Sequence, residues 1–248
     1  MKNEREKEII QLLTTHGYMT VTELSEQLFT SESSIRRHLS SLQNQGLVKR
    51  NYGGAELLTK NSQILPFATR AYRDIVQKQE IARKASALIK DDDVIFLDQS
   101  STTFFLAYEL LKRSHLTIIT NNIEILSLLS ATELEVISAG GRLSKENRSC
   151  LVGDDTIQCF SQIRADHAFF STKALSSDGT LYDCNREEVF VRNTMIANAA
   201  NKVYLCDTGK FDTYSSYRQG SLHDVDYIVT EKKPQDVHLE SFPKLTIL

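Results

Sequence analysis

The stretch from residue 31 to residue 55, SESSIRRHLSSLQNQGLVKRNYGGA, decides the fold of the first part of the chain. Ser31 is a favoured helix N-cap residue. Ile35, Leu39 and Leu42 follow it at the three- and four-residue spacing of an amphipathic helix. Two short β-prone runs come next, on either side of a Gly-Gly turn. The stretch therefore predicts a helix followed by a β-hairpin.

Two more helices precede this stretch. Ile9, Leu12 and Leu13 give residues 3–15 one apolar face. Thr20-x-x-Glu23 is a capping box, in which each residue satisfies a backbone amide of the other, so it predicts the start of a short second helix. Three helices and a hairpin make a small winged helix-turn-helix domain, which we assign to residues 1–56.

The net charge of −3, from 29 basic and 32 acidic residues, argues against a nucleic-acid partner when it is taken as a whole. The charge is unevenly spread, however. Residues 1–30 carry three basic and five acidic residues, residues 31–60 carry five and two, and the remainder carries 21 and 25. A short basic module is thus attached to an acidic body, and only the module needs to meet phosphate.

The third helix presents small hydroxyls and guanidinium groups opposite its apolar stripe. Arginine can donate twice to guanine in the major groove, while serine allows close approach to the DNA backbone. Arg36 and His38 are expected on the flanks of this outward face. The alternative interpretation is an ordinary solvated helix face. The basic hairpin beside it favours double-stranded DNA, and the expected contacts are Ser33, Ser34, Arg36, Arg37, Ser40, Lys49, Arg50 and Tyr52.

A linker is expected over residues 57–76, which lack a clean amphipathic period and contain Pro66. From residue 77 to residue 248, apolar runs alternate with helical patterns, which indicates an α/β domain with a mostly parallel sheet. The expected strands are 94–97, 116–119, 135–138, 168–170, 203–205 and 227–229, and the expected helices are 81–89, 104–111, 123–129 and 187–200.

Polar or glycine residues follow one predicted strand after another. Ligands of open parallel sheets bind beyond the carboxyl ends of the strands, and a run of hydroxyls at a helix start suits a phosphate. Each residue taken singly has a plainer reading as a helix cap or as half of an ion pair. The candidates for binding phosphate and sugar hydroxyls are Asp98, Ser100, Ser101, Thr102, Thr103, Thr120, Asn121, Gly140, Gly141, Lys173, Glu187, Glu188 and Lys210.

Signatures of other classes are missing from the sequence. It contains no GxSxG, P-loop or HExxH pattern, which favours a protein that is not an enzyme and has no catalytic residues. The four cysteines form no CxxC pair and have no zinc-ligand spacing, so we expect reduced thiols, no metal and no cofactor. No apolar run is long enough for a membrane span and the N-terminus is charged, so we expect a cytoplasmic protein with no membrane partner.

These residues together resemble the DeoR family of bacterial transcription regulators. The resemblance rests on residues 31–39 and 46–55 and continues over nearly the whole chain, through Pro66-Phe67, Arg70, residues 98–103, Thr120-Asn121, Gly140-Gly141, Gly153, Asp166, Met195-Ile196 and Lys210-Phe211.

The resemblance implies a repressor of a sugar-catabolic operon whose C-terminal domain is related to ribose-5-phosphate isomerase and senses a phosphorylated sugar. It also implies that the loop at residues 98–103 receives the phosphate. Three residues depart from the family pattern: Ser100 replaces a usual glycine, His38 replaces a usual aspartate, and Lys173 lies where small residues are usual.

We therefore expect a homo-oligomer that binds operator DNA and is released by a phosphorylated sugar bound in the C-terminal domain. Two alternatives stay open at this stage. The C-terminal domain would be a sugar-phosphate isomerase in one and a module used only for oligomerisation in the other.

Overall fold

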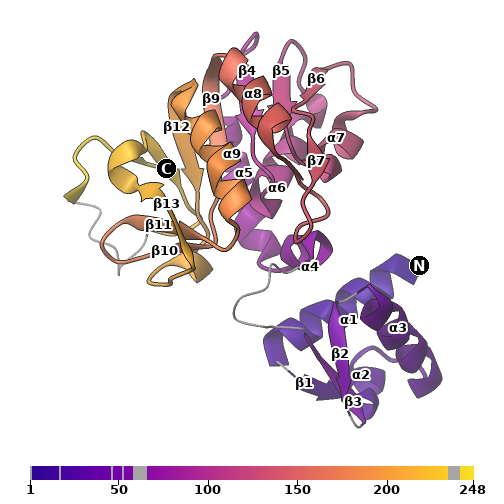
Figure 1. Ribbon diagram of the computed structural model, residues 1–248. Coiled ribbons are helices and arrows are strands. Elements are labelled where there is room, and N and C mark those ends of the chain that lie inside the picture. The colour runs from indigo at the N-terminus through magenta and orange to yellow at the C-terminus, as the bar shows by residue number, and fades with distance from the viewer. Residues whose placement is uncertain (1, 17, 46, 52, 58–65, 234–240) are drawn as a thin grey trace. The chain divides into compact units, whose positions relative to one another are not determined.

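The computed structural model describes residues 2–16, 18–45, 47–51, 53–57, 66–233 and 241–248 (Figure 1). The chain divides into two compact units, Met1–Arg73 and Asp74–Leu248, which we call the N-terminal and C-terminal units. The division lies inside the segment 57–76 that we expect as a linker. The described residues of this segment include the short helix α4 (Phe67–Tyr72) and the start of α5 (Ile75–Ser86).

The N-terminal unit is a winged helix-turn-helix, as expected. The capping box is present: the Thr20 hydroxyl accepts a hydrogen bond from the Glu23 amide (3.1 Å), and the Glu23 carboxylate accepts one from the Thr20 amide (2.7 Å). The two strands of the predicted hairpin pair antiparallel and form the wing. A third short strand, which we did not expect, pairs with the second strand of the hairpin. The elements are α1 (Lys2–His16), β1 (Tyr18–Thr20), α2 (Val21–Gln27), α3 (Glu32–Asn44), β2 (Val48–Asn51) and β3 (Gly54–Leu57).

Our placement of His38 on the flank of the third helix was wrong. The residue is buried and its Nδ1 lies 3.8 Å from Oε1 of Glu6, which is buried on α1. The reason is that α1 packs against α3, so the buried face of α3 includes His38 in addition to Ile35, Leu39 and Leu42. His38 thus faces the interior of the unit, away from the exposed arginines.

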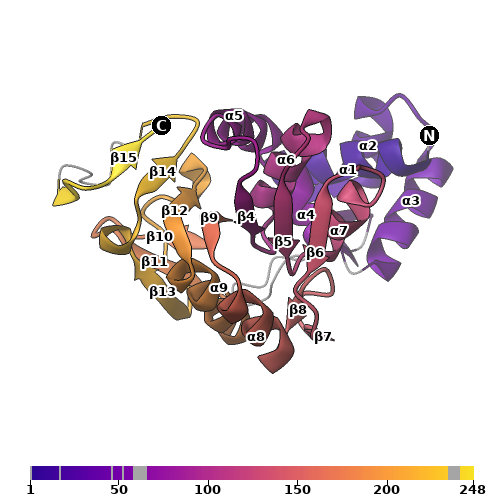
Figure 2. The ribbon, with the colours of Figure 1, turned by 90° about the horizontal axis from the view of Figure 1, so that it is seen from above.

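The C-terminal unit is built on a seven-stranded parallel sheet in the order β15-β14-β12-β9-β4-β5-β6. In Figure 2, α5, α6 and α7 cover one face of this sheet, and α8 and α9 cover the other. The strands are β4 (Val94–Leu97), β5 (Thr117–Thr120), β6 (Glu135–Ser138), β9 (Ala165–Phe170), β12 (Ala199–Leu205), β14 (Tyr227–Val229) and β15 (Thr246–Ile247). The helices are α5 (Ile75–Ser86), α6 (Ser101–Glu109) with the 3-10 turn Leu110–Lys112, α7 (Ile123–Leu129), α8 (Asp154–Gln162) and α9 (Arg186–Ala197).

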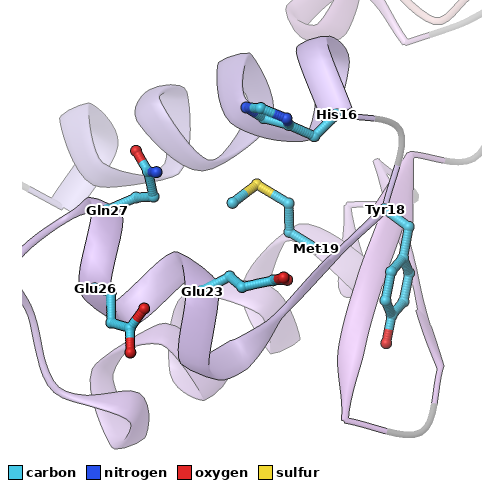
Figure 3. A pocket seen from close by; sticks show the side chains of 6 residues that line it. All are labelled: His16, Tyr18, Met19, Glu23, Glu26 and Gln27. Atoms are coloured by element: carbon cyan, nitrogen blue, oxygen red, sulfur yellow. The ribbon is translucent and has the colours of Figure 1, made fainter.

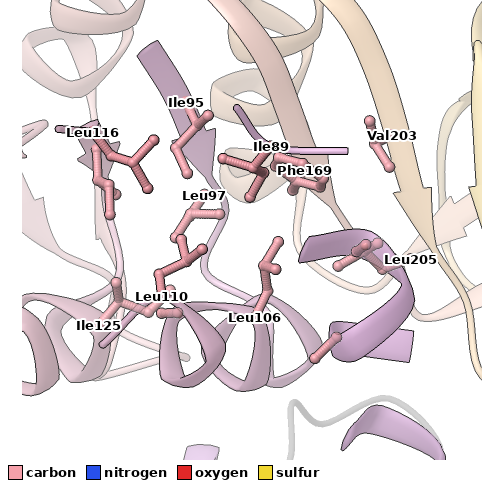
Figure 4. Close-up of a cluster of buried hydrophobic side chains, with 14 of the residues drawn as sticks. Ile89, Ile95, Leu97, Leu106, Leu110, Leu116, Ile125, Phe169, Val203 and Leu205 are labelled. Atoms are coloured by element: carbon pink, nitrogen blue, oxygen red, sulfur yellow. The ribbon is translucent and has the colours of Figure 1, made fainter. Parts of the chain in front are cut away.

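Strand β4 shows why the sheet is buried on both faces. Successive side chains of a strand point to opposite faces. Ile95 and Leu97 pack under α5 and α6 in the cluster drawn in Figure 4, while Phe96 packs with α8 and α9. All three side chains are fully buried, which explains why a short run of continuous apolar residues predicts a central parallel strand.

Smaller elements complete the unit and were not expected. A hairpin of β7 (Arg142–Leu143) and β8 (Leu151–Val152) follows the sheet strand β6. A separate antiparallel sheet contains β10 (Ala174–Leu175), β11 (Thr180–Asp183) and β13 (Tyr217–Ser221). Two further 3-10 turns, Thr208–Lys210 and Leu222–Asp224, flank β13. Over the described ranges, no helix has the length and apolar character that crossing a bilayer requires.

Candidate functional site

The exposed face of α3 carries the expected DNA-reading residues. Ser33, Arg36 and Arg37 are exposed there. Arg36 donates to the Glu32 carboxylate at 3.0 Å, whereas Arg37 has no ion pair within the part of the chain that the structure describes. Arg37 could therefore contact DNA without first breaking an ion pair, whereas Arg36 would have to leave Glu32.

The wing is joined to the same helix by a hydrogen bond. Arg50 Nη1 on β2 donates to the Ser40 hydroxyl on α3 at 2.8 Å. Lys49 is exposed, with its ammonium 3.7 Å from Glu56, and Ser34 is half-buried at the helix start. Five of the expected DNA contacts thus lie on α3 and two on the adjoining wing strand, while Tyr52 lies outside the described residues.

A depression of about 310 Å³ lies in the N-terminal unit. Figure 3 draws six of the side chains that line it. Two carboxylates of α2, Glu23 and Glu26, line it, and Glu23 already belongs to the capping box. This charge opposes binding of an anion such as a phosphate. The other lining residues are His16, Tyr18, Met19 and Gln27.

In the C-terminal unit, the sheet order places a topological switch point between β4 and β9. Strands β5 and β6 continue from β4 on one side, and β9 and β12 lie on the other. Ligands of open α/β sheets bind at such a point, beyond the carboxyl ends of the strands. The residues that follow β4, Asp98 to Ser100, and the residue that follows β9, Ser171, meet there: the Ser171 amide lies 3.2 Å from Asp98 Oδ2.

Asp98 is fully buried and holds the loop together. Its Oδ1 accepts from the Ser100 amide at 3.0 Å and lies 3.0 Å from the Thr103 hydroxyl. Its Oδ2 accepts from the Ser171 amide and, at 2.9 Å, from Arg192 Nε. The carboxylate therefore orients the loop and has no oxygen left without a protein partner.

Arg192, on α9, is the main residue that the sequence reasoning missed. Its guanidinium bridges Asp98, Asp183 (Nη1 to Oδ2, 2.8 Å) and the Gln219 side chain (2.6 Å). Burial lowers the pKa of Arg192, but the carboxylates of Asp183, Asp98 and Glu188 together raise it by more, so that the group stays charged. Arg192 thereby connects the loop after β4 with β11 and β13 of the small sheet. Sequence reasoning missed this role because Asp98 lies 94 residues before Arg192 and meets it only in the folded unit.

The hydroxyl run after β4 divides into two pairs. Ser100 is the N-cap of α6, and its hydroxyl accepts from the Thr103 amide at 3.1 Å. The Thr103 hydroxyl is enclosed by Asp98 and Ser100. Ser101 and Thr102 occupy the first turn, whose amides point out of the helix and favour an anion. The φ of −75° at Ser100 is ordinary for any residue, so its Cβ causes no backbone strain.

Lys210 faces this helix start from the other side of the switch point. Its ammonium donates to the Ser171 hydroxyl at 2.6 Å and lies 3.5 Å from the Thr102 hydroxyl and 3.0 Å from Asp207 Oδ2. Burial lowers the pKa of Lys210, but the opposing effects of its neighbours, of which Asp207 is the largest, together raise it by more. Burial raises the pKa of Asp207, but Lys210, Lys78 and the hydrogen bonds of the carboxylate together lower it by more. A half-buried cation, the Lys210 ammonium, thus lies at the start of α6.

Two of the other expected residues lie at the carboxyl end of strand β5: Thr120 is its last residue and Asn121 follows it. The Thr120 hydroxyl is used internally, because it donates to the Leu97 carbonyl at 2.7 Å. Asn121 is fully buried; its Nδ2 donates to the Leu151 carbonyl at 3.0 Å and lies 3.5 Å from Gln99 Oε1.

The glycine pair follows β6. Both residues have positive φ, and a Cβ at Gly141 would meet the Thr156 hydroxyl at 2.1 Å. Close packing on α8 therefore accounts for Gly141.

The charged candidates lie in different surroundings. Lys173 is exposed beyond the end of β9, and Glu187 forms an ion pair with Arg142 at the surface. Glu188, the next residue on α9, is instead buried and accepts from Gln99 (2.9 Å) and Asn147 (3.0 Å). Asp98, Ser100 to Thr103 and Lys210 are thus brought together, while Lys173 and Glu187 are at the periphery.

Thiols and metal ligands contribute little to this site. None of the four cysteines forms a disulfide bond, and burial raises the pKa of the Cys184 and Cys206 thiols to about 12, which leaves them protonated and unreactive near neutral pH. Among the residues that the structure describes, no three His, Cys, Asp or Glu side chains are grouped to hold a metal ion.

Comparison with known proteins assigns the chain to a family. A model of the DeoR-like helix-turn-helix domain matches residues 5–61, and a model of the DeoR C-terminal sensor domain matches residues 73–232. The L-fucose operon activator of Escherichia coli (strain K12) is 34% identical over 236 residues, which is 94% of this chain and 96% of that protein. The glycerol-3-phosphate regulon repressor of the same organism is 31% identical over 234 residues, 94% and 92% of the two chains.

A solved structure of ribose 5-phosphate isomerase A from Methanocaldococcus jannaschii is similar to 54% of this chain and 53% of its own, with 20% identity and a TM-score of 0.41. The two family models between them cover both units, and the relatives match the chain almost from end to end. The chain belongs to the DeoR family of DNA-binding transcription regulators.

Proposed function

We propose that this regulator represses a sugar-catabolic operon in the cytoplasm and is released from its operator by a phosphorylated sugar. One observation carries the effector part of this proposal: the first turn of α6, with Ser101 and Thr102, faces the half-buried ammonium of Lys210 at the switch point of the sheet. A helix start and a cation together favour a dianionic phosphate. Relatives named as regulators of glycerol-3-phosphate and L-fucose genes support the sugar class.

The remaining candidates divide by role in this proposal. Ser101, Thr102 and Lys210 bind the phosphate, while Asp98, Ser100, Thr103 and Thr120 hold the loops in place through the internal hydrogen bonds described above. Asn121, Gly140, Gly141, Lys173 and Glu187 line the approach to the site. In the N-terminal unit, Arg37 reads bases, and Arg36, Lys49 and Arg50 contact phosphates of the DNA.

The mechanism is a shift of population between two states. A homo-oligomer presents two winged helices to two half-sites, and the sugar phosphate binds more tightly to the conformation that does not fit the operator. An effector that changes DNA affinity fivefold to 150-fold needs only about 1–3 kcal/mol of coupling between the sites.

We propose no enzymatic activity. Both oxygens of Asp98 already accept hydrogen bonds, and Lys210 is held by Asp207 and Ser171, so neither group is placed as a free base or acid. A turnover assay with pentose and hexose phosphates tests this part: measurable isomerisation would favour the enzyme alternative.

Thermal unfolding of the full chain in the presence of inorganic phosphate and of triose, pentose and hexose phosphates tests the effector site. A ligand at 100 times its Kd stabilises the folded state by about 2.7 kcal/mol, so binding raises the Tm. Lys210→Met and Thr102→Val should abolish the shift, whereas Lys90→Met, at an exposed lysine, should keep it. If no sugar phosphate shifts the wild-type Tm, the proposal fails and a module used only for oligomerisation becomes the better reading.

A further inference from the structure

A buried histidine and a buried glutamate face each other in the N-terminal unit without a hydrogen bond between them, and we call them the α1–α3 pair. His38 on α3 is 6% exposed, and Glu6 on α1 is 7% exposed. Nδ1 of His38 lies 3.8 Å from Oε1 of Glu6, which is too long for a hydrogen bond. Among the described residues, neither atom has a hydrogen-bond partner. The pair is therefore an open contact inside the core of the unit.

The second oxygen of Glu6 already joins the two helices. Oε2 accepts a hydrogen bond at 3.3 Å from Nε2 of Gln45, the residue that caps the end of α3. Gln45 follows His38 by about two helical turns, so both residues lie on one side of α3. Glu6 thus holds the end of α3 through one oxygen, while its contact with the middle of α3 stays open.

A single proton closes this contact. A carboxylate oxygen only accepts, and a ring nitrogen without a proton also accepts, so the separation of 3.8 Å fits a neutral ring whose proton is on Nε2. Histidine takes up a second proton between about pH 8 and pH 5. The protonated ring donates a charge-assisted hydrogen bond of about 2.7–2.9 Å, so the two atoms move about 1 Å closer. Because the two groups interact, the proton belongs to the pair.

The charged side chains around the α1–α3 pair leave this proton to Glu6. They lie on α1, on α3 and on the elements packed against these helices, which are α2, α4 and the three strands of the unit. The described ones are bound elsewhere or exposed: Arg5 with Glu8, Arg36 with Glu32, Lys49 with Glu56, Arg50 with Ser40, Lys7 over Tyr72, Arg70 over Phe67, and the exposed His16, Glu23, Glu26 and Arg37. Glu6 is therefore the charge that a proton on His38 meets.

The state of the pair reaches DNA through α3. The exposed Ser33, Arg36 and Arg37 belong to this helix and move with it. A hydrogen bond to a base edge tolerates a change of only a few tenths of an ångström, so a displacement of about 1 Å alters these contacts. A helix held at two points is better preorganised for binding. The proton also neutralises a buried carboxylate, which reduces the repulsion of DNA phosphates. Both effects favour DNA binding by the protonated pair.

We infer that the α1–α3 pair is a proton-dependent positioning device for the DNA-binding helix, so that the chain binds its operator more tightly at mildly acid pH than at alkaline pH. His38 and Glu6 are buried and act through α3, which carries the expected DNA contacts. The inference concerns DNA binding by the N-terminal unit and is independent of the effector proposed above.

Fluorescence anisotropy of the full chain on a DNA fragment selected by its own binding tests this inference, at pH 8 and pH 5.5 and constant ionic strength. The wild type should bind about fivefold or more tightly at pH 5.5, the lower end of ordinary coupling between two sites. His38→Asn places an amide that does not titrate near the position of Nδ1, so its affinity should stay within about twofold over this range. Glu6→Gln removes the charge that attracts the proton and should flatten the response in the same way. The matched control is His16→Asn, at the other histidine of the N-terminal unit, which is exposed on α1 and should keep the wild-type response.

The pH response separates this role from simple support of the fold. Variants of His38 and Glu6 that weaken DNA binding by one factor at both pH values, and so keep the wild-type response, overturn the inference. A smaller response of the wild type, or loss of the response in His16→Asn, overturns it as well. If His38→Asn does not fold, as judged by the calorimetric transition of the N-terminal unit, Glu6→Gln decides by the same criterion.

Discussion

Replacement of Arg192 by methionine is the sharpest test of how the C-terminal unit is held together. Methionine keeps an unbranched side chain at this fully buried position but removes the guanidinium that bridges Asp98, Asp183 and Gln219. Two carboxylates from different parts of the unit then stay buried without their shared cation. In the variant, the loop after β4 keeps the hydrogen bond from the Ser171 amide to Asp98 but loses its ion pair with α9.

The magnitude follows from the burial. Removing one partner of a buried ion pair costs about 3–5 kcal/mol, because the other charge stays uncompensated. In a unit of this size, 1 kcal/mol corresponds to about 2–4 °C in Tm, so the C-terminal unit should unfold about 6–20 °C lower. Arg192→Lys should fall between the wild type and Arg192→Met, because a single ammonium cannot span both carboxylates and the glutamine.

Differential scanning calorimetry of the full chain is the assay, because the two units have separate cores and can give separate transitions. Arg186→Met is the control: this arginine is exposed on the same helix and stacks on Phe190, which is worth about 0.5–1 kcal/mol. A Tm for Arg192→Met within 2 °C of the wild type would refute the role that we give to the bridge.

Three further predictions concern DNA binding, pH dependence and the capping box. Arg37→Ala should weaken operator binding by about 1–3 kcal/mol in a fluorescence anisotropy titration and leave sugar-phosphate affinity unchanged; equal operator affinity would sink the assignment. Burial lowers the pKa of His167, against the opposing effect of Asp93, so the native state binds fewer protons than the unfolded chain. The contribution of His167 to stability is therefore present above the usual pKa of 6.5 and is lost as the pH falls. In urea unfolding, the free energy of unfolding should fall less between pH 7 and pH 5 for His167→Gln than for the wild type. An equal fall in both proteins would contradict this. Thr20→Ala should destabilise the N-terminal unit by about 1 kcal/mol in the same unfolding assay, and an unchanged midpoint would show that the capping box contributes nothing.

Elements with a strong local pattern were predictable from the sequence. The run Val94–Leu97 forms β4, and the capping box at Thr20 begins α2. Both were predictable because a strand that is buried on two faces and a helix cap each depend on residues that are adjacent or nearly adjacent in the sequence. The strands β7, β8 and β10 were missed because two residues carry no period. Helix α8 was missed although its polar and apolar residues alternate at helical spacing; it begins after Gly153, without a side-chain cap.

The site was predictable only in part. The hydroxyl run after β4 stood out because four such residues are consecutive at a strand end. Arg192 and Asp183 did not, because they are distant in sequence from Asp98 and meet it only through the packing of α9 and β11 against the sheet. Partner choice among buried charges is a property of the tertiary fold, and His38 was misplaced for the same reason, since its neighbour Glu6 lies on another helix.

The central claim is that a sugar phosphate in the C-terminal unit controls DNA binding by the N-terminal unit. The most direct measurement is the affinity of the full chain for a DNA fragment selected by its own binding, titrated with and without triose, pentose and hexose phosphates. We predict that at least one of them changes the affinity fivefold or more, and that Thr102→Val removes this change while it keeps the DNA affinity of the unliganded protein. Equal DNA affinity with and without every sugar phosphate would contradict the account.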